Sequence, residues 1–251
     1  RDLLDGTRPR AVLEFAPTWG TILDLDAPML CVEAIDIESA ARFLVPAEAV
    51  LHPLPDALGG MRYFGTGSNG LASGNSVEEA TVHGLAEVIE RDITSFHNVR
   101  DNARLVRPET LPEVVRGLRD RIDAAGFELV VRYLPNPFGL PAFMAVSFDR
   151  NQPEITLRGD GCHPSKEVAL MRAVTETIQC RLSLIHGGRD DLDVVYRPVS
   201  PLPQEERASL YRRVLSRLCQ DPAPLDYADI ADRSDGVHAL ASCLSRLLSP
   251  L

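Results

Sequence analysis

Apolar residues recur at two spacings along the chain, and the change of spacing separates expected strands from expected helices. Short or alternating apolar runs predict strands over residues 11–15, 21–25, 29–37, 128–135, 142–149 and 155–162. Apolar residues three and four apart predict helices over residues 76–99, 111–126, 164–185, 204–219 and 236–248. Strands that are interleaved with long helices predict an α+β (mixed α/β) fold.

Polar and turn-forming residues mark where these elements begin and end. Ser76 with Glu79 fits a capping box at the start of the first long helix, and Asn75 is the alternative cap. Pro164 falls in the first turn of the third helix, a position that helices tolerate. Residues 47–66 hold prolines and glycines and predict a loop.

The first long helix carries a row of acidic side chains beside its apolar face. At about 100° per residue, four polar residues fall within about 80° of arc: Glu79, His83, Glu87 and Glu90. Like charges three or four residues apart repel by a few tenths of a kcal/mol, and no lysine stands in the row to offset them. Arg91 lies beside the row rather than within it.

Two interpretations of this row stay open. It is a solvated helix face, or it is a binding site for a divalent cation. Mg²⁺ takes oxygen ligands, usually one or two carboxylates together with substrate phosphates. Under the second interpretation Glu87 and Glu90, one turn apart, hold the ion.

A glycine-rich stretch, GTGSNGLASGN over residues 65–75, leads into the same helix. Glycines let the backbone approach a ligand closely, and a helix N-terminus favours anions. The stretch matches neither the phosphate-binding pattern of nucleoside triphosphatases nor the dinucleotide fingerprint. A plain turn is therefore an alternative interpretation.

The third long helix has a polar stripe of its own. Arg172, Glu176, Gln179 and Ser183 fall within about 60° of arc, opposite the apolar positions. Because buried polar stripes need partners, we expect Glu176 and Gln179 to face the same cavity as Glu87 and Glu90. An ion pair between Arg172 and Glu176 is the alternative. Arg181 projects on the apolar side, where it binds a phosphate or extends its charged end to solvent.

Composition excludes several classes of protein. The chain has 251 residues, a net charge of −10 and a pI near 5.1, which argues against general binding of nucleic acid. No apolar run is long enough to span a membrane. The five cysteines are scattered without a Cys-x-x-Cys pair, which favours reduced thiols in a cytoplasmic protein and disfavours a zinc site.

Three stretches resemble the YcaO superfamily. SNGLASGNSVEEATVHGLAEVIERD is similar to its central signature, and EVALMRAVTETIQCRLSLIHGGRDDL resembles its second conserved helix with the turn that follows. GFELVVRYLPNPFGLPAFMAVSFD fits the region between them. The resemblance covers roughly residues 60–192, with two long motifs in the right order and spacing.

The resemblance implies an enzyme that uses ATP and Mg²⁺ to phosphorylate a backbone amide oxygen of a ribosomally made precursor peptide. A Cys, Ser or Thr side chain as nucleophile gives a thiazoline or oxazoline by cyclodehydration. An external sulfide, delivered by a sulfur-donating partner, gives a thioamide. A catalytically inactive scaffold or peptide-binding subunit is the alternative of another class.

The resemblance also implies site residues. Glu87 and Glu90 match the metal-binding acids. The residues expected to bind the nucleotide are Ser68, Asn69, Glu79, His83, Arg91, Glu176 and Gln179. Arg172 or Arg181 is expected to steady the transition state. His83 stands where many members carry Gln, so its role as a ligand is open.

Two family elements are not found: an upstream S-x-x-x-E-x-x-E-R helix and the proline-rich C-terminal tail of many azoline-forming members. The expectation is therefore a single YcaO-like domain over residues 1–251, with sheets packed against long helices and without its N-terminal and C-terminal segments. The amphipathic helix over 236–248 packs on the same domain or on a second subunit. We expect a homodimer or a partner protein.

Overall fold

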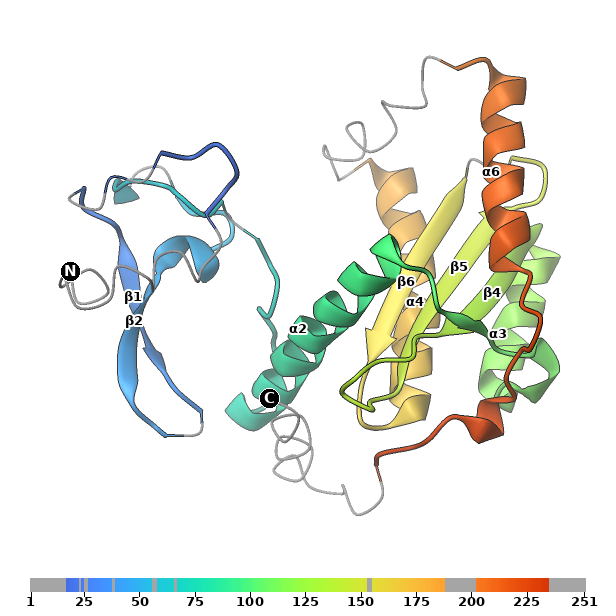
Figure 1. Cartoon of the computed structure of the whole chain (residues 1–251), viewed down its shortest axis with the longest axis horizontal. Coiled ribbons are helices and arrows are strands. Elements are labelled where there is room, and N and C mark those ends of the chain that lie inside the picture. Colours follow the sequence, from blue (N-terminus) through green and yellow to red (C-terminus); the bar gives the residue numbers. More distant parts are fainter. Residues whose placement is uncertain are drawn as a thin grey trace. The chain divides into compact units, whose positions relative to one another are not determined.

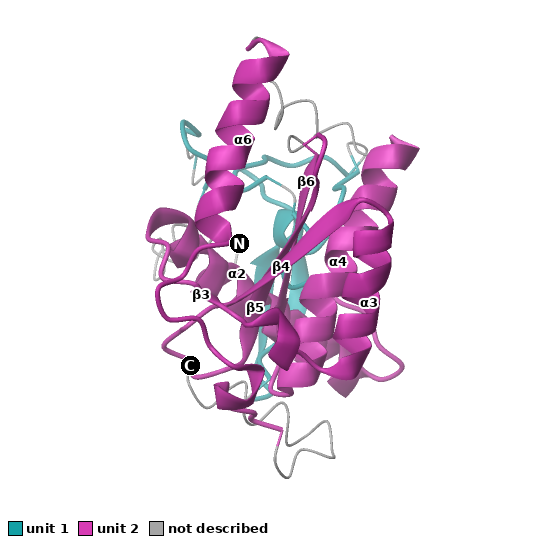
Figure 2. Ribbon diagram, turned by 90° about the vertical axis from the view of Figure 1, so that its right-hand side faces the viewer, with its two compact units in different colours: residues 1–71 teal, residues 72–251 magenta. Residues whose placement is uncertain are grey.

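The computed structural model describes residues 17–22, 24, 27–37, 39–55, 58–65, 67–152, 155–187 and 202–234. The chain forms two compact units, residues 1–71 and residues 72–251 (Figure 2). The single domain expected over residues 1–251 stays a prediction. The expected strand over 11–15 and the expected helix over 236–248 lie outside the described residues.

The first unit contains a β-hairpin and a short 3₁₀ helix. Strands β1 (Cys31–Ile35) and β2 (Arg42–Pro46) pair antiparallel, and η1 (Ala47–Ala49) follows directly. The buried carboxylate of Glu48 accepts the N–H groups of Tyr63 at 2.6 Å and Phe64 at 3.1 Å. These bonds fix the residues just before the glycine-rich stretch to η1. The sequence predicted β1 but not β2, and the described residues of the run 21–25 form no strand.

The second unit contains one antiparallel sheet in the order β3-β4-β5-β6. Its strands are β3 (Arg104–Leu105), β4 (Phe127–Tyr133), β5 (Ala142–Asp149) and β6 (Thr156–Cys162). Its α-helices are α2 (Val77–Val99), α3 (Glu113–Ala124), α4 (Lys166–His186) and α6 (Gln204–Leu218). Two 3₁₀ helices, η3 (Pro108–Thr110) and η4 (Tyr227–Asp229), complete the elements described. The α+β prediction is confirmed.

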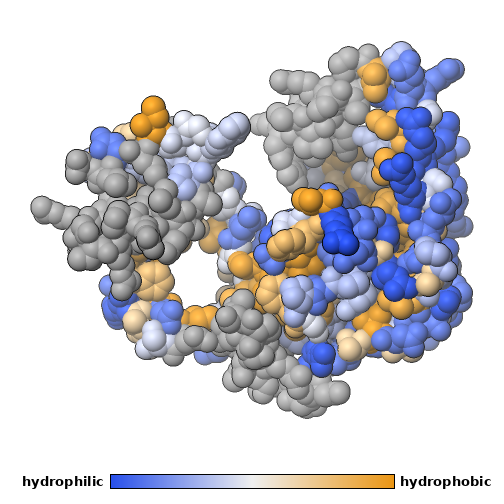
Figure 3. Space-filling model, viewed as in Figure 1, coloured by the Kyte–Doolittle hydropathy of each residue, from blue (hydrophilic) through white to orange (hydrophobic). Residues whose placement is uncertain are grey.

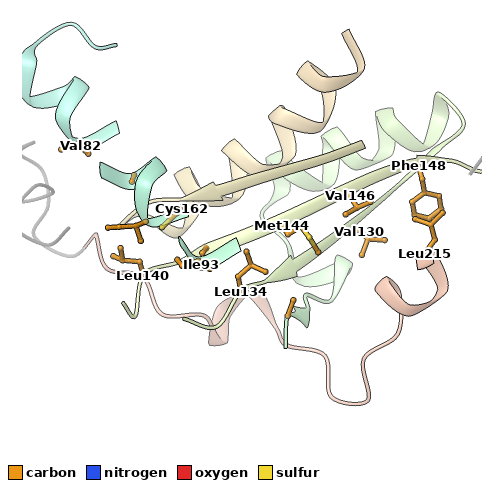
Figure 4. Packing of buried hydrophobic residues seen from close by; sticks show 14 residues of the cluster. Val82, Ile93, Val130, Leu134, Leu140, Met144, Val146, Phe148, Cys162 and Leu215 are labelled. Atoms are coloured by element: carbon orange, nitrogen blue, oxygen red, sulfur yellow. The ribbon is translucent and has the colours of Figure 1, made fainter. Parts of the chain in front are cut away.

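Helices cover both faces of this sheet, because its strands are apolar on both sides. One face packs against α2 and α6, with Val130 and Met144 of the sheet beside Ile93 and Leu215 (Figure 4). The other face packs against α3 and α4 in a second apolar cluster. Hydrophilic side chains gather over the outer side of α6 (Figure 3). Among the described residues no helix is both long and apolar enough to span a bilayer.

Two glycines let α4 lie directly on β6. A Cβ at Gly159 would come within 2.2 Å of the Ala173 carbonyl oxygen, and one at Gly161 within 2.1 Å of the Ala169 carbonyl oxygen. Atoms cannot approach so closely, so the backbone contact requires glycine at both positions. The residues that alternate with them point to the opposite face, where Cys162 packs in the cluster with α2.

We therefore expect Gly161→Ala to destabilise the protein by about 3 kcal/mol or more, because helix and strand must separate to admit the methyl group. Gly117→Ala is the matched control, since a Cβ there meets nothing within 4 Å. It should be neutral or stabilising by up to about 1 kcal/mol within α3. Urea unfolding followed by circular dichroism measures both. Equal stability of the two variants would contradict the close packing of α4 on β6.

Candidate functional site

A polar pocket of about 310 Å³ is lined by residues of α2, α4 and β6. Its lining residues come from these three elements: His83, Glu87, Glu90, Arg91, Asp160, Arg172, Thr175, Glu176 and Gln179. Glu176 and Gln179 of the polar stripe therefore share one cavity with Glu87 and Glu90, as expected. Figure 1 shows α2 and α4 on the two sides of β6. Both helices contact β6, which is the last strand of the sheet on that side, and so both can line a pocket at its edge.

The free edge of β6 positions two of the acids. The backbone N–H of Cys162 donates to Oε2 of Glu90 at 2.9 Å, and the N–H of Asp160 donates to Oε2 of Glu176 at 2.7 Å. Alternate N–H groups of an edge strand point away from the sheet and need acceptors. One carboxylate from α2 and one from α4 supply them. The bonds to the strand thus fix both side chains at the pocket.

The pocket holds more acidic than basic side chains: four carboxylates against Arg91 and Arg172. Burial raises the pKa of Glu90 to about 7, and the carboxylates of Asp160 and Glu176 add to the rise. Burial likewise raises the pKa of Glu176. Arg91 lies 3.6 Å from Glu87, between Nη2 and Oε1. The alternative interpretation, an ion pair between Arg172 and Glu176, is not observed, and Arg172 makes no ion pair with any other described residue.

The raised pKa of Glu90 predicts a pH-dependent loss of stability in the protein without ligand. The folded state holds the proton up to about pH 7, whereas the unfolded chain releases it near the ordinary pKa of 4.5. The free energy of unfolding therefore falls as the pH rises through this window, and the loss is complete above pH 7. Glu90→Gln removes the charge and keeps an acceptor for the Cys162 N–H.

We expect Glu90→Gln to be more stable than the parent by about 2–3 kcal/mol at pH 8, with little difference at pH 4. Denaturant unfolding at the two pH values measures this. Asp120→Asn, an exposed change on α3, is the control and should alter stability by less than about 0.5 kcal/mol at either pH. A gain from Glu90→Gln that is the same at pH 4 and pH 8 would contradict the charge explanation.

The other residues predicted for the site lie in different places. Oε2 of Glu79 accepts the Asn75 N–H at 2.7 Å, while the Ser76 hydroxyl accepts the Glu79 N–H at 3.2 Å, so Glu79 belongs to the helix cap. Ser68 and Asn69 belong to the other compact unit, and their contacts with a nucleotide stay a prediction. Glu79 does not line the pocket.

Arg181 points away from the pocket, with its guanidinium carbon 4.0 Å from the centroid of the Phe127 ring. It does not line the pocket, so of the two arginines expected to act in catalysis the structure brings only Arg172 to the acids. Two lining residues were not predicted, Asp160 and Thr175. Thr175 directly precedes Glu176 in the sequence but lies outside the polar stripe. Asp160 lies in the predicted strand 155–162, where residues two apart share a face.

The donor set fits a divalent cation bound together with phosphate. Four carboxylates line one small pocket, where burial, and after it the charges of Asp160 and Glu176, raise the pKa of Glu90. No group of three or more His, Cys, Asp and Glu side chains in the described part of the chain could hold a metal ion by itself. Mg²⁺ needs only one or two carboxylates when phosphate oxygens and waters complete its shell. A cation would also reduce the repulsion among the acids.

A family model described as YcaO cyclodehydratase, ATP- and Mg²⁺-binding, matches residues 7–249. An uncharacterized protein of Methanothermobacter thermautotrophicus is 35% identical over 191 residues, which are 74% of this chain and 49% of that protein. An uncharacterized protein in the tfuA 3′ region of Rhizobium leguminosarum is 38% identical over 140 residues, 51% of this chain and 33% of that protein. The chain thus spans about half the length, or less, of these curated relatives.

Solved structures share the fold. The structure of YcaO from Methanopyrus kandleri bound with AMPPCP and Mg²⁺ has a TM-score of 0.68 and 25% identity, over 92% of this chain and 58% of that chain. A chain of the E. coli microcin synthetase McbBCD complex has a TM-score of 0.57 and 20% identity, over 75% of this chain and 52% of that chain. At 20% identity the second likeness shows the fold alone.

Proposed function

The chain belongs to the YcaO family, which binds ATP and Mg²⁺, and we propose that it activates backbone amides of a ribosomally made peptide. One observation carries the proposal. A single pocket at the edge of β6 holds four carboxylates from three elements, with Arg91 and Arg172 beside them. Phosphoryl transfer depends on this kind of site, because its catalysis is mostly positioning and neutralisation of phosphate charge.

Glu87 and Glu90 would hold Mg²⁺ from α2, with Glu176 facing them from α4. When bound, Mg²⁺ and ATP together supply a phosphoryl group that turns the amide oxygen into a leaving group. The N–H of Cys162 keeps the Glu90 carboxylate in place before any ligand arrives. The N–H of Asp160 does the same for Glu176, so the site needs little rearrangement on binding.

Arg172 is the cation best placed to meet negative charge that develops during transfer. It lines the pocket and makes no ion pair with another described residue, so its charge is available to a substrate. Arg91 is held beside Glu87 and would offset phosphate charge at the rim. The side chains of His83, Gln179 and Thr175 add hydrogen-bonding groups that would orient the ligands.

The proposed product is an azoline, formed by attack of a Cys, Ser or Thr side chain on the preceding amide carbon. The alternative is a thioamide, for which a partner delivers the sulfur. A relative lies in the tfuA 3′ region, so the product of a neighbouring gene is a candidate partner for this chain as well. A homodimer stays part of the proposal, as does a cytoplasmic location.

The test is ATP turnover by the full chain, with and without peptides encoded beside its gene. We expect phosphate release to need Mg²⁺ and to rise when the right peptide is added. Mass spectrometry then separates the products, since an azoline has lost one water and a thioamide has exchanged oxygen for sulfur. Nucleotide binding without turnover under every condition would favour the inactive peptide-binding subunit.

A further inference from the structure

Residues on one face of β6 form a small polar network outside the apolar cores. Gly159 and Gly161 face α4, so alternation turns Arg158 and Asp160 to the other face, toward α2. Nε of Arg158 donates to both carboxylate oxygens of Asp160, at 3.1 Å and 2.9 Å, and Nη2 donates to Oδ1 at 3.0 Å. Its remaining nitrogen, Nη1, donates to Oδ1 of Asn98 at 2.8 Å.

This network ties the strand to the last turn of α2. Asn98 precedes the final residue of that helix, far along the axis from its acidic row. A planar guanidinium that uses all three nitrogens on two acceptors has one orientation, and it imposes that orientation on the carboxylate that it holds. The side chain of Asp160 is 12% exposed, whereas that of Arg158 is 36% exposed. Arg158 is thus the more exposed partner of this pair.

Asp160 is the fourth carboxylate of the pocket, beside Glu90 and Glu176. Three acids that face one another would turn apart or bind protons unless something held them. Backbone N–H groups hold Glu90 and Glu176, but the described hydrogen bonds to the Asp160 carboxylate come from Arg158. Arg158 itself does not line the pocket.

We propose that Arg158 is a positioning residue that presents the Asp160 carboxylate to the Mg²⁺-nucleotide complex. The inference rests on the proposed function of the pocket. Arg158 offsets part of the charge of Asp160 and fixes its direction, so the ligand meets an acid that is already oriented. Residues that orient a metal-binding carboxylate typically change affinity by about 10–100-fold when they are replaced.

The test is the rise in melting temperature that AMPPCP and Mg²⁺ produce, measured over a range of Mg²⁺ concentrations in the full chain. We expect Arg158→Gln and Asp160→Asn each to need about tenfold more Mg²⁺ for half the rise. The double variant should need no more than either single one, because both remove the same interaction. Arg158→Lys keeps the positive charge but not the planar guanidinium with its several donors. Its Mg²⁺ requirement should lie between those of the parent and Arg158→Gln.

A second readout is the split between kinetic constants for ATP turnover. In Arg158→Gln the KM for Mg²⁺ should rise about tenfold, as the half-rise concentration does, while kcat at saturating Mg²⁺ stays within about threefold of the parent. Arg150→Gln removes an exposed arginine that pairs with Asp123 at the far end of the sheet, and it should leave both readouts unchanged.

The outcomes separate the inference from the function on which it rests. A merely structural role for Arg158 would lower the melting temperature of the ligand-free protein and leave the Mg²⁺ dependence as in the parent, which would overturn the inference alone. A parent protein that shows no rise with AMPPCP and Mg²⁺ would overturn the proposed function and the inference with it. Additive effects of Arg158→Gln and Asp160→Asn would also overturn the inference.

Discussion

Replacing Glu87 or Glu90 by Gln is expected to reduce ATP turnover at least about 100-fold, the largest effect that the pocket predicts. Each change removes one negative charge while keeping the size of the side chain. A metal ion stabilises transition-state charge by several kcal/mol, so losing a carboxylate that holds it should cost a large part of that. The measurement is phosphate release under saturating ATP and Mg²⁺.

Asp92→Asn is the matched control on the same helix. Asp92 is an exposed acid of α2 that does not line the pocket, so turnover should stay near that of the parent. Circular dichroism and the melting temperature establish that each variant is folded. Near-normal turnover by either glutamate variant, with its fold intact, would show that the acids of α2 do not hold a catalytic cation.

The helices that form the pocket could be predicted because their periodicity is strong and local. The expected helix over 76–99 is observed as α2 (Val77–Val99), and the one over 164–185 as α4 (Lys166–His186). Angles on each helix place its acids on one stripe. The need to satisfy buried polar stripes then indicates that the two helices face each other. All but two of the lining residues, Asp160 and Thr175, were therefore predicted from the sequence.

The rest depends on contacts that no local pattern encodes. β3 (Arg104–Leu105) is too short to show a periodicity and exists because it pairs with β4. The strand 155–162 was predicted, but its place at the edge of the sheet is set by strand order. That place is what leaves the Asp160 and Cys162 N–H groups free for the site acids. Asp160 was missed for the same reason.

The two arginines of α4 show the same limit. Arg172 and Arg181 are both cations on one helix near the acids in sequence, and either could serve an anionic transition state. The angle on the helix already placed Arg181 on the apolar side. Its contact with the ring of Phe127 is seen only in the structure, because it depends on how β4 packs against α4. An arginine over an aromatic face contributes about 0.5–1 kcal/mol to stability at an exposed site.

Replacing Arg172 by Ala is therefore expected to lower kcat for ATP turnover about 100-fold, with a smaller change in KM. The reason is that negative charge develops as phosphoryl transfer proceeds. A cation that interacts with this charge stabilises the transition state more than the bound substrate. Arg172→Lys should recover part of the loss, since the charge is restored without the planar donor geometry.

Arg181→Ala is the contrasting variant on the same helix. It should lower the free energy of unfolding by about 1 kcal/mol through loss of the contact with Phe127 and reduce kcat far less than Arg172→Ala. Steady-state kinetics and denaturant unfolding of the three variants measure both quantities. A larger loss of kcat in Arg181→Ala than in Arg172→Ala would reverse the assignment, because the arginine that acts on phosphate would then be the one outside the pocket.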